Sequence, residues 1–346
     1  MKPYCTVPAI LAITLFASVE SAQATEEGVF LDPATGNYTV RYIGAVDSDA
    51  PGLLQEGTYF VSTKIEPVLA SAYIWAANNS IRYGYAITNR GQQPLIGFVV
   101  PCVGYAPINL WESPVGWRTI VNVSNFIPQT RDLNWGFLDI DEDLDVPPTK
   151  GLAPGSRQAG FTLDSPALPG IAEACMEGNA QFPTFTTQFL DDQSPSGMQI
   201  EEKLDEIREN DHVLRFAAIP TFPIPSPFSA PVLLGNIRAH ATDWPAKSLM
   251  EPELWTAVDR MLDAAIRELT KGHTAVGLLK LSEIRAALRM KYPDLDKTTA
   301  HDDPKPEQIP GDPAAYKAFL GLHDRRLAAK VLDFDVAFVA KKLTPP

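Results

Sequence analysis

The stretch from Ser80 to Pro101, SIRYGYAITNRGQQPLIGFVVP, is the feature that most constrains the fold. In its first half, large apolar residues alternate with Arg82, Gly84, Ala86 and Thr88, which is the period of two of a strand with one buried face. Turn-forming residues follow at Asn89 and Gly91, and then a second apolar run covers 95–100. The stretch therefore predicts a β-hairpin at the centre of a β-sandwich.

Similar short runs precede and follow the predicted hairpin, separated by turns rich in Gly, Pro and Asn. They cover residues 37–43, 58–65, 117–123, 133–138 and 155–163. Strands at this spacing are typical of an antiparallel sandwich, so residues 25–192 are predicted to form one β-sandwich domain.

The pattern changes after residue 192. Residues 193–231 include a charged segment with helical character at 198–210 and the proline-dense run AAIPTFPIPSPFSAP at 217–231, and they are interpreted as a connector. An irregular edge packed on the sandwich is the alternative for this run. From 232 to 346 the apolar residues recur at helical spacing, and Asp312-Pro313 has the form of a helix start. These residues are predicted to form a small antiparallel helical bundle.

The first 24 residues have the features of a signal peptide. Lys2 is followed by an apolar segment from Val7 to Val19, and Ala22-Gln23-Ala24 has the form of a cleavage site. No later segment is apolar enough over a sufficient length to cross a bilayer. The chain is therefore expected to be secreted or periplasmic, without a transmembrane segment.

Export also determines how the cysteines are interpreted. Cys5 lies in the predicted signal peptide, which leaves Cys102 and Cys175. Two cysteines in an oxidising compartment predict a Cys102–Cys175 disulfide, and two buried thiols are the alternative.

The acidic segment Asp139, Asp141, Asp143 and Asp145 is the sharpest candidate for a metal site. Its alternating carboxylates have the chemistry that Ca²⁺ prefers, but Leu144 stands where an EF-hand-like loop would need glycine. A solvated acidic loop is the other interpretation. Calcium is thus the single cofactor considered, and weak binding or none is expected.

The aromatic residues, the histidines and the net charge bear on other kinds of function. Four tryptophans fall in the predicted sandwich, where they indicate either a glycan-binding face or a buried core, namely Trp75, Trp111, Trp117 and Trp135. The five histidines show no HExxH spacing, and no G-x-S-x-G elbow is present. The formal net charge of −13 argues against nucleic-acid binding.

Several motifs resemble those of secreted bacterial Ig-like β-sandwich proteins with an appended C-terminal helical module. They are Tyr83-Gly-Tyr85-Ala-Ile-Thr-Asn89, Gly116-Trp117, Trp135-Gly136, Ala153-Pro-Gly-Ser156 before Gly160-Phe161, Leu168-Pro-Gly170, Asp324-Arg325 and Val331-Leu-Asp-Phe334. The resemblance implies export and an Ig-like architecture. That family has no assigned function, so the resemblance transfers no catalytic residue.

The sequence therefore favours a secreted, non-enzymatic binding or structural protein of the cell envelope or the extracellular space, with a protein or a surface glycan as partner. The alternatives are an extracellular hydrolase acting on polysaccharide or peptide, and a calcium-stabilised adhesion or carbohydrate-binding module. Carboxylate pairs for glycoside hydrolysis need not be close in sequence, so the first alternative stays open.

Overall fold

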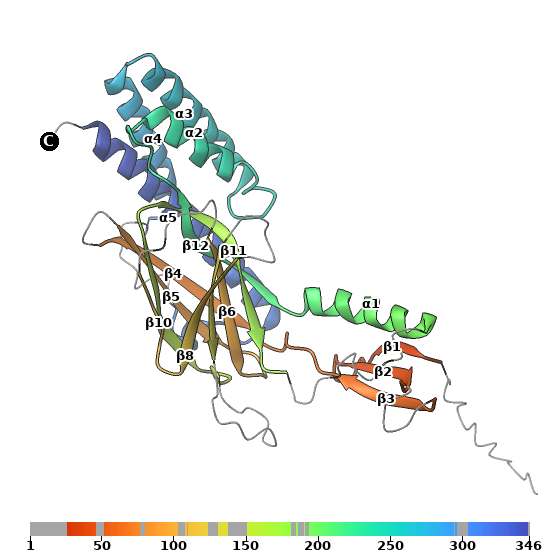
Figure 1. Cartoon of the computed structure of the whole chain (residues 1–346). Helices are drawn as coiled ribbons and strands as arrows, with labels where there is room; N and C mark the ends of the chain where they lie inside the picture. The colour runs from red at the N-terminus through yellow and green to blue at the C-terminus, as the bar shows by residue number, and fades with distance from the viewer. Residues whose placement is uncertain are drawn as a thin grey trace, which may run out of the picture.

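The structure is a computed structural model, and it combines a β-rich body, a helical bundle and a small side lobe (Figure 1). It describes residues 26–45, 52–76, 80–102, 108, 110–123, 131–137, 151–180, 185, 190, 194–293, 295 and 304–344. The predicted signal peptide and the segment from Asp139 to Asp145 lie outside these ranges.

Two antiparallel sheets form the body. One sheet has the order β4-β5-β10-β7 and is called the four-stranded sheet; the other has the order β12-β11-β6-β9-β8 and is called the five-stranded sheet. The strands of the first are Pro67–Trp75, Ile81–Asn89, Arg157–Ser165 and Leu110–Glu112. Those of the second are Val213–Phe222, Leu168–Gly178, Leu95–Cys102, Arg131–Phe137 and Trp117–Val123.

Aromatic rings from both sheets fill the space between them. Tyr85 and Phe161 come from the four-stranded sheet, and Phe98 and Trp135 come from the five-stranded sheet. The rings of Phe98 and Trp135 stack with centroids 5.3 Å apart, and Tyr85 meets Phe98 edge to face at 5.5 Å. The alternation in the sequence thus identified the buried face of β5 correctly.

The predicted central hairpin is wrong, although both of its strands exist. β5 pairs with β4 and β10, whereas β6 pairs with β9 and β11, so consecutive strands belong to opposing sheets. Asn89 stabilises the segment that connects β5 to β6, because its side-chain amide donates to the carbonyls of Gln93 and Leu152. The period of two fixes which side chains are buried, but it does not choose the neighbouring strand.

The side lobe is built from β1 (Gly28–Leu31), β2 (Tyr38–Ile43) and β3 (Leu54–Tyr59), which form a sheet in this order, together with α1 (Pro195–Asn210). A separate apolar cluster joins the sheet and the helix through Val40, Tyr42, Ile200 and Leu204, among others. The strand predicted at 37–43 therefore belongs to this lobe and not to the sandwich. Of the strand predicted at 58–65, only the first two residues lie in a strand, at the end of β3, and the rest form no strand.

The proline-rich run at 217–231 differs from the extended connector predicted for it. Its first six residues lie in β12, which pairs with β11 at the edge of the five-stranded sheet. An edge position tolerates Pro220, since the missing N–H faces no further strand. The alternative of an edge packed on the sandwich describes this part better.

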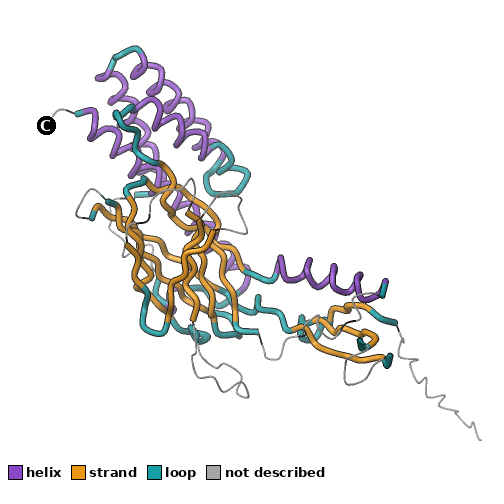
Figure 2. Tube along the Cα trace, in the orientation of Figure 1, coloured by secondary structure: helices purple, strands orange, loops and turns teal. Residues whose placement is uncertain are grey.

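The C-terminal part is helical, as predicted. The helices are α2 (Ala230–Ala241), α3 (Pro252–Thr270), α4 (Thr274–Lys291), the short η5 (Pro306–Gln308) and α5 (Pro313–Leu343). The Asp312 carboxylate caps α5 by accepting from the Ala315 N–H at 2.8 Å. Figure 2 shows α2, α3 and α4 grouped beyond one end of the sandwich, with the long α5 running past it.

Helix α5 joins the bundle to the sandwich. Phe334 stacks on Trp75 of β4, and the ring nitrogen Nε2 of His323 donates to the Leu69 carbonyl. A single hydrophobic cluster includes residues of both parts, from Ile65 in the β-rich part to Val339 in α5. The coarse division into a β-rich N-terminal part and a helical C-terminal part is thus confirmed, while the Ig-like topology is not established by these strand orders.

Candidate binding site

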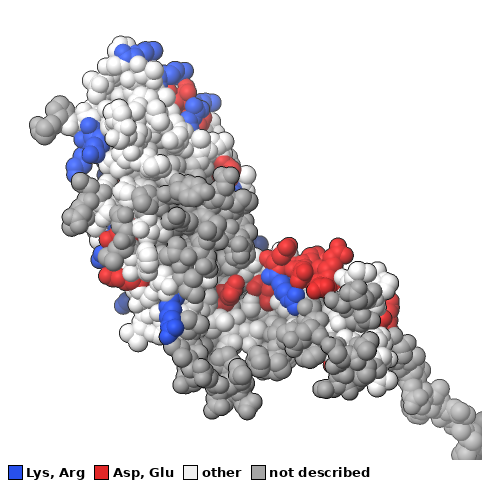
Figure 3. Space-filling view, viewed as in Figure 1, with Lys and Arg blue, Asp and Glu red and all other residues white. Residues whose placement is uncertain are grey.

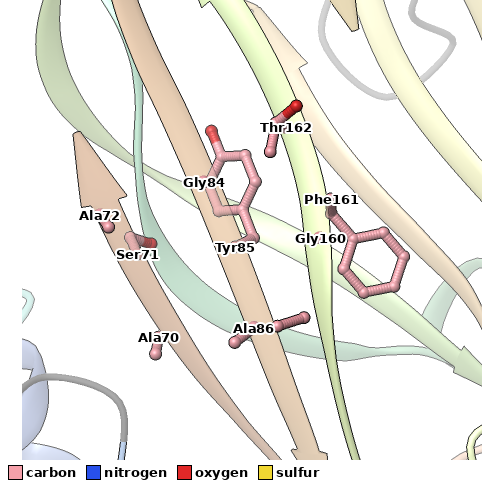
Figure 4. Close-up of a pocket in the computed structure, with 10 residues that line it drawn as sticks. Ala70, Ser71, Ala72, Gly84, Tyr85, Ala86, Gly160, Phe161 and Thr162 are labelled. Atoms are coloured by element: carbon pink, nitrogen blue, oxygen red, sulfur yellow. The ribbon is translucent and has the colours of Figure 1, made fainter. Parts of the chain in front are cut away.

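The outer face of the four-stranded sheet carries a shallow hollow of about 260 Å³ (Figure 4). Strand register places Ala72, Gly84 and Thr162 in one row across β4, β5 and β10. Ala70, Ala86 and Ala159 form the next row. Because these side chains are small, the backbone of three strands is the floor of the hollow.

Two glycines shape this floor. Gly160 has a φ of +97° and lies where the register between β5 and β10 shifts, so it forms a β-bulge. Any other residue at this position would adopt a strained backbone conformation. Gly84 is in ordinary strand conformation, and a Cβ built on it meets nothing within 4 Å. The space above Gly84 is therefore empty because of the residue type and not because the backbone demands glycine.

The interior side of the same strands is rigidly held. The Tyr85 hydroxyl donates to the Ala218 carbonyl of β12 at 2.9 Å, and the Ala218 N–H donates to Ser71 Oγ at 3.2 Å. These bonds tie β4 and β5 to the edge of the opposing sheet. The hollow thus has a preformed floor that does not have to be ordered when a ligand binds.

Polar and charged groups border the hollow on one side. Arg82 donates to both carboxylate oxygens of Asp164, at 2.8 and 3.1 Å, and this contact raises the pKa of Arg82 above its ordinary value. Thr162 Oγ1 donates to Glu112 at 3.2 Å. Beyond the opposite end, Val68 is covered by Ile309 and Tyr316.

A second, more polar hollow of about 200 Å³ lies within the side lobe, between its sheet and the C-terminal end of α1. Its lining includes Tyr38, Thr63, Lys203, Glu206 and Asp211. Lys203 is paired with Glu206 at 2.6 Å, and the Asp211 carboxylate accepts from Tyr59 and from the Ser62 N–H. The charged groups Lys203, Glu206 and Asp211 thus already have partners, so we interpret this hollow as part of the junction between lobe and sandwich.

Acidic residues gather on α1, where Figure 3 shows a red surface on the side lobe. The helix contributes Glu201, Glu202, Asp205, Glu206 and Glu209. Among the described residues no group of three His, Cys, Asp or Glu side chains is arranged to hold a metal ion. The predicted calcium loop lies outside the described ranges and stays a prediction.

The four tryptophans of the proposed glycan-binding face are dispersed. Trp117 and Trp135 are buried between the sheets. Trp75 and Trp111 are each 43% exposed, but they lie on β4 and β7, the two opposite edges of the four-stranded sheet. Trp75 is also stacked on Phe334 and Phe338. They form no common strip for a sugar.

His240, His273 and His323 have structural partners. His240 Nε2 accepts from the Ile171 N–H at 3.0 Å, and burial lowers its pKa. Burial likewise lowers the pKa of His323. His273 contacts the Glu268 carboxylate at 2.7 Å on the surface. None of the three lies beside a described nucleophile in a hollow.

The predicted Cys102–Cys175 disulfide is not tested, because the side chain of Cys102 lies outside what the structure describes. The backbone register bears on it nonetheless. Cys175 lies opposite Val99 of β6, and Cys102 lies opposite Arg131 of β9. Three residues along a strand span about 10 Å, more than the Cα separation of a disulfide, so a bridge would need a local shift.

Sequence analysis missed the hollow, although its signal was present. Ala70, Ala72, Gly84 and Ala86 are alternate residues of two adjacent strands, all on the face opposite the large apolar ones. Small outward residues on neighbouring strands mark a place where another backbone or side chain can approach closely.

No family model and no curated protein matches the chain. No helix in the described ranges has the length and apolar character needed to cross a bilayer. The resemblance to secreted Ig-like proteins therefore remains an expectation from the motifs alone.

Proposed function

We propose that this chain is an exported, non-enzymatic binding protein that holds a partner protein on the outer face of its four-stranded sheet. The observation that carries the proposal is the preformed hollow over Ala72, Gly84 and Thr162. A bulky apolar side chain of the partner fills it, and the charged border formed by Arg82 and Asp164 lies along one side of the contact.

Size and composition support a protein partner over a small molecule. Pockets for small molecules usually measure about 300–1,000 Å³ and enclose most of the ligand, whereas this hollow is shallow. Protein interfaces combine a desolvated apolar centre with a polar rim, and single anchoring side chains contribute most of the binding energy. The apolar floor and charged border have that arrangement. The signal-like N-terminus supports placing the contact in the envelope or outside the cell.

The decisive variant is Gly84→Trp, which fills the hollow from its own floor. A Cβ on Gly84 meets nothing within 4 Å, so the new side chain can leave the backbone freely over the hollow, and an aromatic residue suits a strand. Gly136→Trp is the matched control, because Gly136 lies on β9 opposite Gly97, on the outer face of the other sheet, and also has nothing within 4 Å of a built Cβ.

The full chain is used to capture partners from the native envelope, and the captured protein is then purified and titrated against all three proteins. We expect Gly84→Trp to weaken binding by at least tenfold while its Tm stays close to that of the unmodified chain. Gly136→Trp should bind normally. Equal binding by both variants, or the absence of any partner that distinguishes them, would contradict the proposal.

A further inference from the structure

Helix α5 contains a buried carboxyl group that no described residue neutralises. Asp335 is 0% exposed, and neither of its carboxyl oxygens has a hydrogen-bond partner within the described ranges. Asp333, two residues earlier, shows the contrast: Arg285 and Arg289 of α4 donate to its oxygens at 3.0–3.3 Å. A charged carboxylate costs several kcal/mol in an apolar interior unless it is paired in this way.

Asp335 lies next to the contacts that hold α5 on the sandwich. Phe334 meets the Tyr73 ring edge to face at 4.9 Å and stacks on Trp75 at 5.7 Å. The Tyr73 hydroxyl is buried and has no hydrogen-bond partner in the described part of the chain either. Burial raises the pKa of Tyr73 well above its ordinary value, and the charge of Asp335 raises it further. The two groups therefore interact electrostatically across the α5–β4 contact.

The cations on the neighbouring elements are engaged elsewhere. Arg238 of α2 pairs with Asp259 and Asp263 of α3, and His240 of α2 accepts from Ile171. Arg215 of β12 donates to the Pro67 carbonyl.

On α5 itself, burial alone lowers the pKa of Lys330, so this lysine shows no influence of the Asp335 carboxyl. The pKa of Asp335 is raised well above its ordinary value, and burial is the cause. Geometry and charge thus agree that this site holds a neutral acid.

We propose that protonation of Asp335 controls the docking of α5 on the sandwich: the helix packs while the carboxyl is neutral, and the contact loosens when alkaline conditions ionise it. The released proton goes to solvent. Ionisation would place an unpaired negative charge next to Phe334 in the helix and close to Tyr73, and the least costly response is local separation that admits water. The device acts on the junction between bundle and sandwich, away from the hollow on the outer sheet face.

The sign of the pH dependence follows from linkage. The unfolded chain releases the Asp335 proton near pH 4, whereas the folded chain keeps it to a higher pH because its pKa is raised. Between these two values the unfolded or open state binds fewer protons, so stability falls as pH rises. The equilibrium constant for opening, which is the ratio of open to docked molecules, should rise by up to about tenfold per pH unit in that window.

Hydrogen exchange of the peptide covering 331–339, measured on the full chain from pH 5 to 9 and corrected for the intrinsic pH dependence, tests the proposal. Protection of this segment should fall with pH in the unmodified chain and stay flat in Asp335→Asn, which keeps the shape but cannot ionise. Asp333→Asn should lower protection at every pH and keep the slope, and Tyr73→Phe should also keep it.

Equal slopes in the unmodified chain and in Asp335→Asn would overturn the proposal. If Asp335→Asn fails to fold, the ionisation of Asp335 is followed directly by NMR of the carboxyl carbon in the unmodified chain. A midpoint at or below about pH 4, the ordinary value, would also overturn it.

Discussion

Ser62 and Asp211 bind each other twice across the junction between the side lobe and the sandwich. The Ser62 N–H donates to the Asp211 carboxylate at 2.8 Å, and Ser62 Oγ donates to the Asp211 backbone carbonyl at 2.6 Å. The same carboxylate accepts from the Tyr59 hydroxyl at 3.0 Å. The residue that follows α1 is thus tied to the residues that follow β3, and the lobe is held by more than its connecting chain.

Replacing Asp211 by Ala should therefore loosen the side lobe. The Ser62 N–H and the Tyr59 hydroxyl lose a charged acceptor, which is worth about 1.5–3 kcal/mol for each such bond. We expect faster hydrogen exchange across 55–65 and faster proteolysis near residue 60. Asp205→Asn, on the exposed side of α1, is the control and should change neither. An unchanged exchange rate in Asp211→Ala would show that the lobe is held in another way.

The Tyr85 hydroxyl should contribute measurably to the sandwich. Tyr85→Phe leaves the aromatic packing with Phe98 intact but removes the donor to the Ala218 carbonyl. Leaving that buried carbonyl unsatisfied should lower the free energy of unfolding by about 1–2 kcal/mol, as measured by urea denaturation. A change below a few tenths of a kcal/mol would mean that β12 is not held to β5 through this bond.

Asp324 gives a second pH-dependent contribution, separate from that of Asp335. Burial raises its pKa to about 6, although Arg215 and Arg325 oppose the shift. The folded pKa lies above the unfolded value, so the contribution of Asp324 to stability should fall as pH rises from about 4 to about 6 and stay constant above that. The loss should be on the order of 2 kcal/mol and disappear in Asp324→Asn, measured as Tm against pH. A Tm difference between the two proteins that is constant from pH 4 to 7 would argue against it.

Sequence and structure lead to different expectations for the isolated helical part. The change in periodicity predicts that residues 232–346 fold alone, but α5 shares its apolar cluster with the sandwich. Without β4, the rings of Phe334 and Phe338 lose Trp75. We expect the fragment to be helical by circular dichroism but to bind a hydrophobic dye and to unfold without a sharp transition. A cooperative, dye-free fragment would support independent domains.

Cys102 and Cys175 remain the predicted disulfide pair. Mass spectrometry of the non-reduced chain should show one linked peptide pair, and its presence would mean that the end of β6 departs from the register with β11 that holds at Val99. Complete alkylation of both thiols without a reductant would show that the two cysteines form no disulfide.

Local patterns predicted several elements correctly and their partners poorly, and they did not identify the strands β4, β11 and β12. The alternation around Tyr83 and Tyr85 identified a strand and its buried face, and Asp312-Pro313 identified the start of α5. Pairing was missed, because nothing local distinguishes a turn back to the neighbouring strand from a crossing to the opposite sheet. For the same reason the sequence assigned the strand at 37–43 to the sandwich. Tyr42 is buried in the apolar cluster of the lobe, and its residue type would suit the core of a sandwich equally well. The hollow was missed because small residues produce no contact to predict.

The crossing between β5 and β6 also has a kinetic consequence. β5 can pair early with its predecessor β4, but its other edge waits for the distant β10, and β6 has no neighbour in the chain to pair with and waits for β9 and β11. Closing such long loops costs entropy before any pairing compensates for it, and topologies of this kind fold slowly. The helices can form within microseconds, but α5 must then wait for β4 and β12 to assemble before its apolar face is covered. Until these strands have assembled, the chain exposes the unpaired strand β6, the free edge of β5 and the apolar face of α5. We expect its dependence on a chaperone to be greatest at this stage.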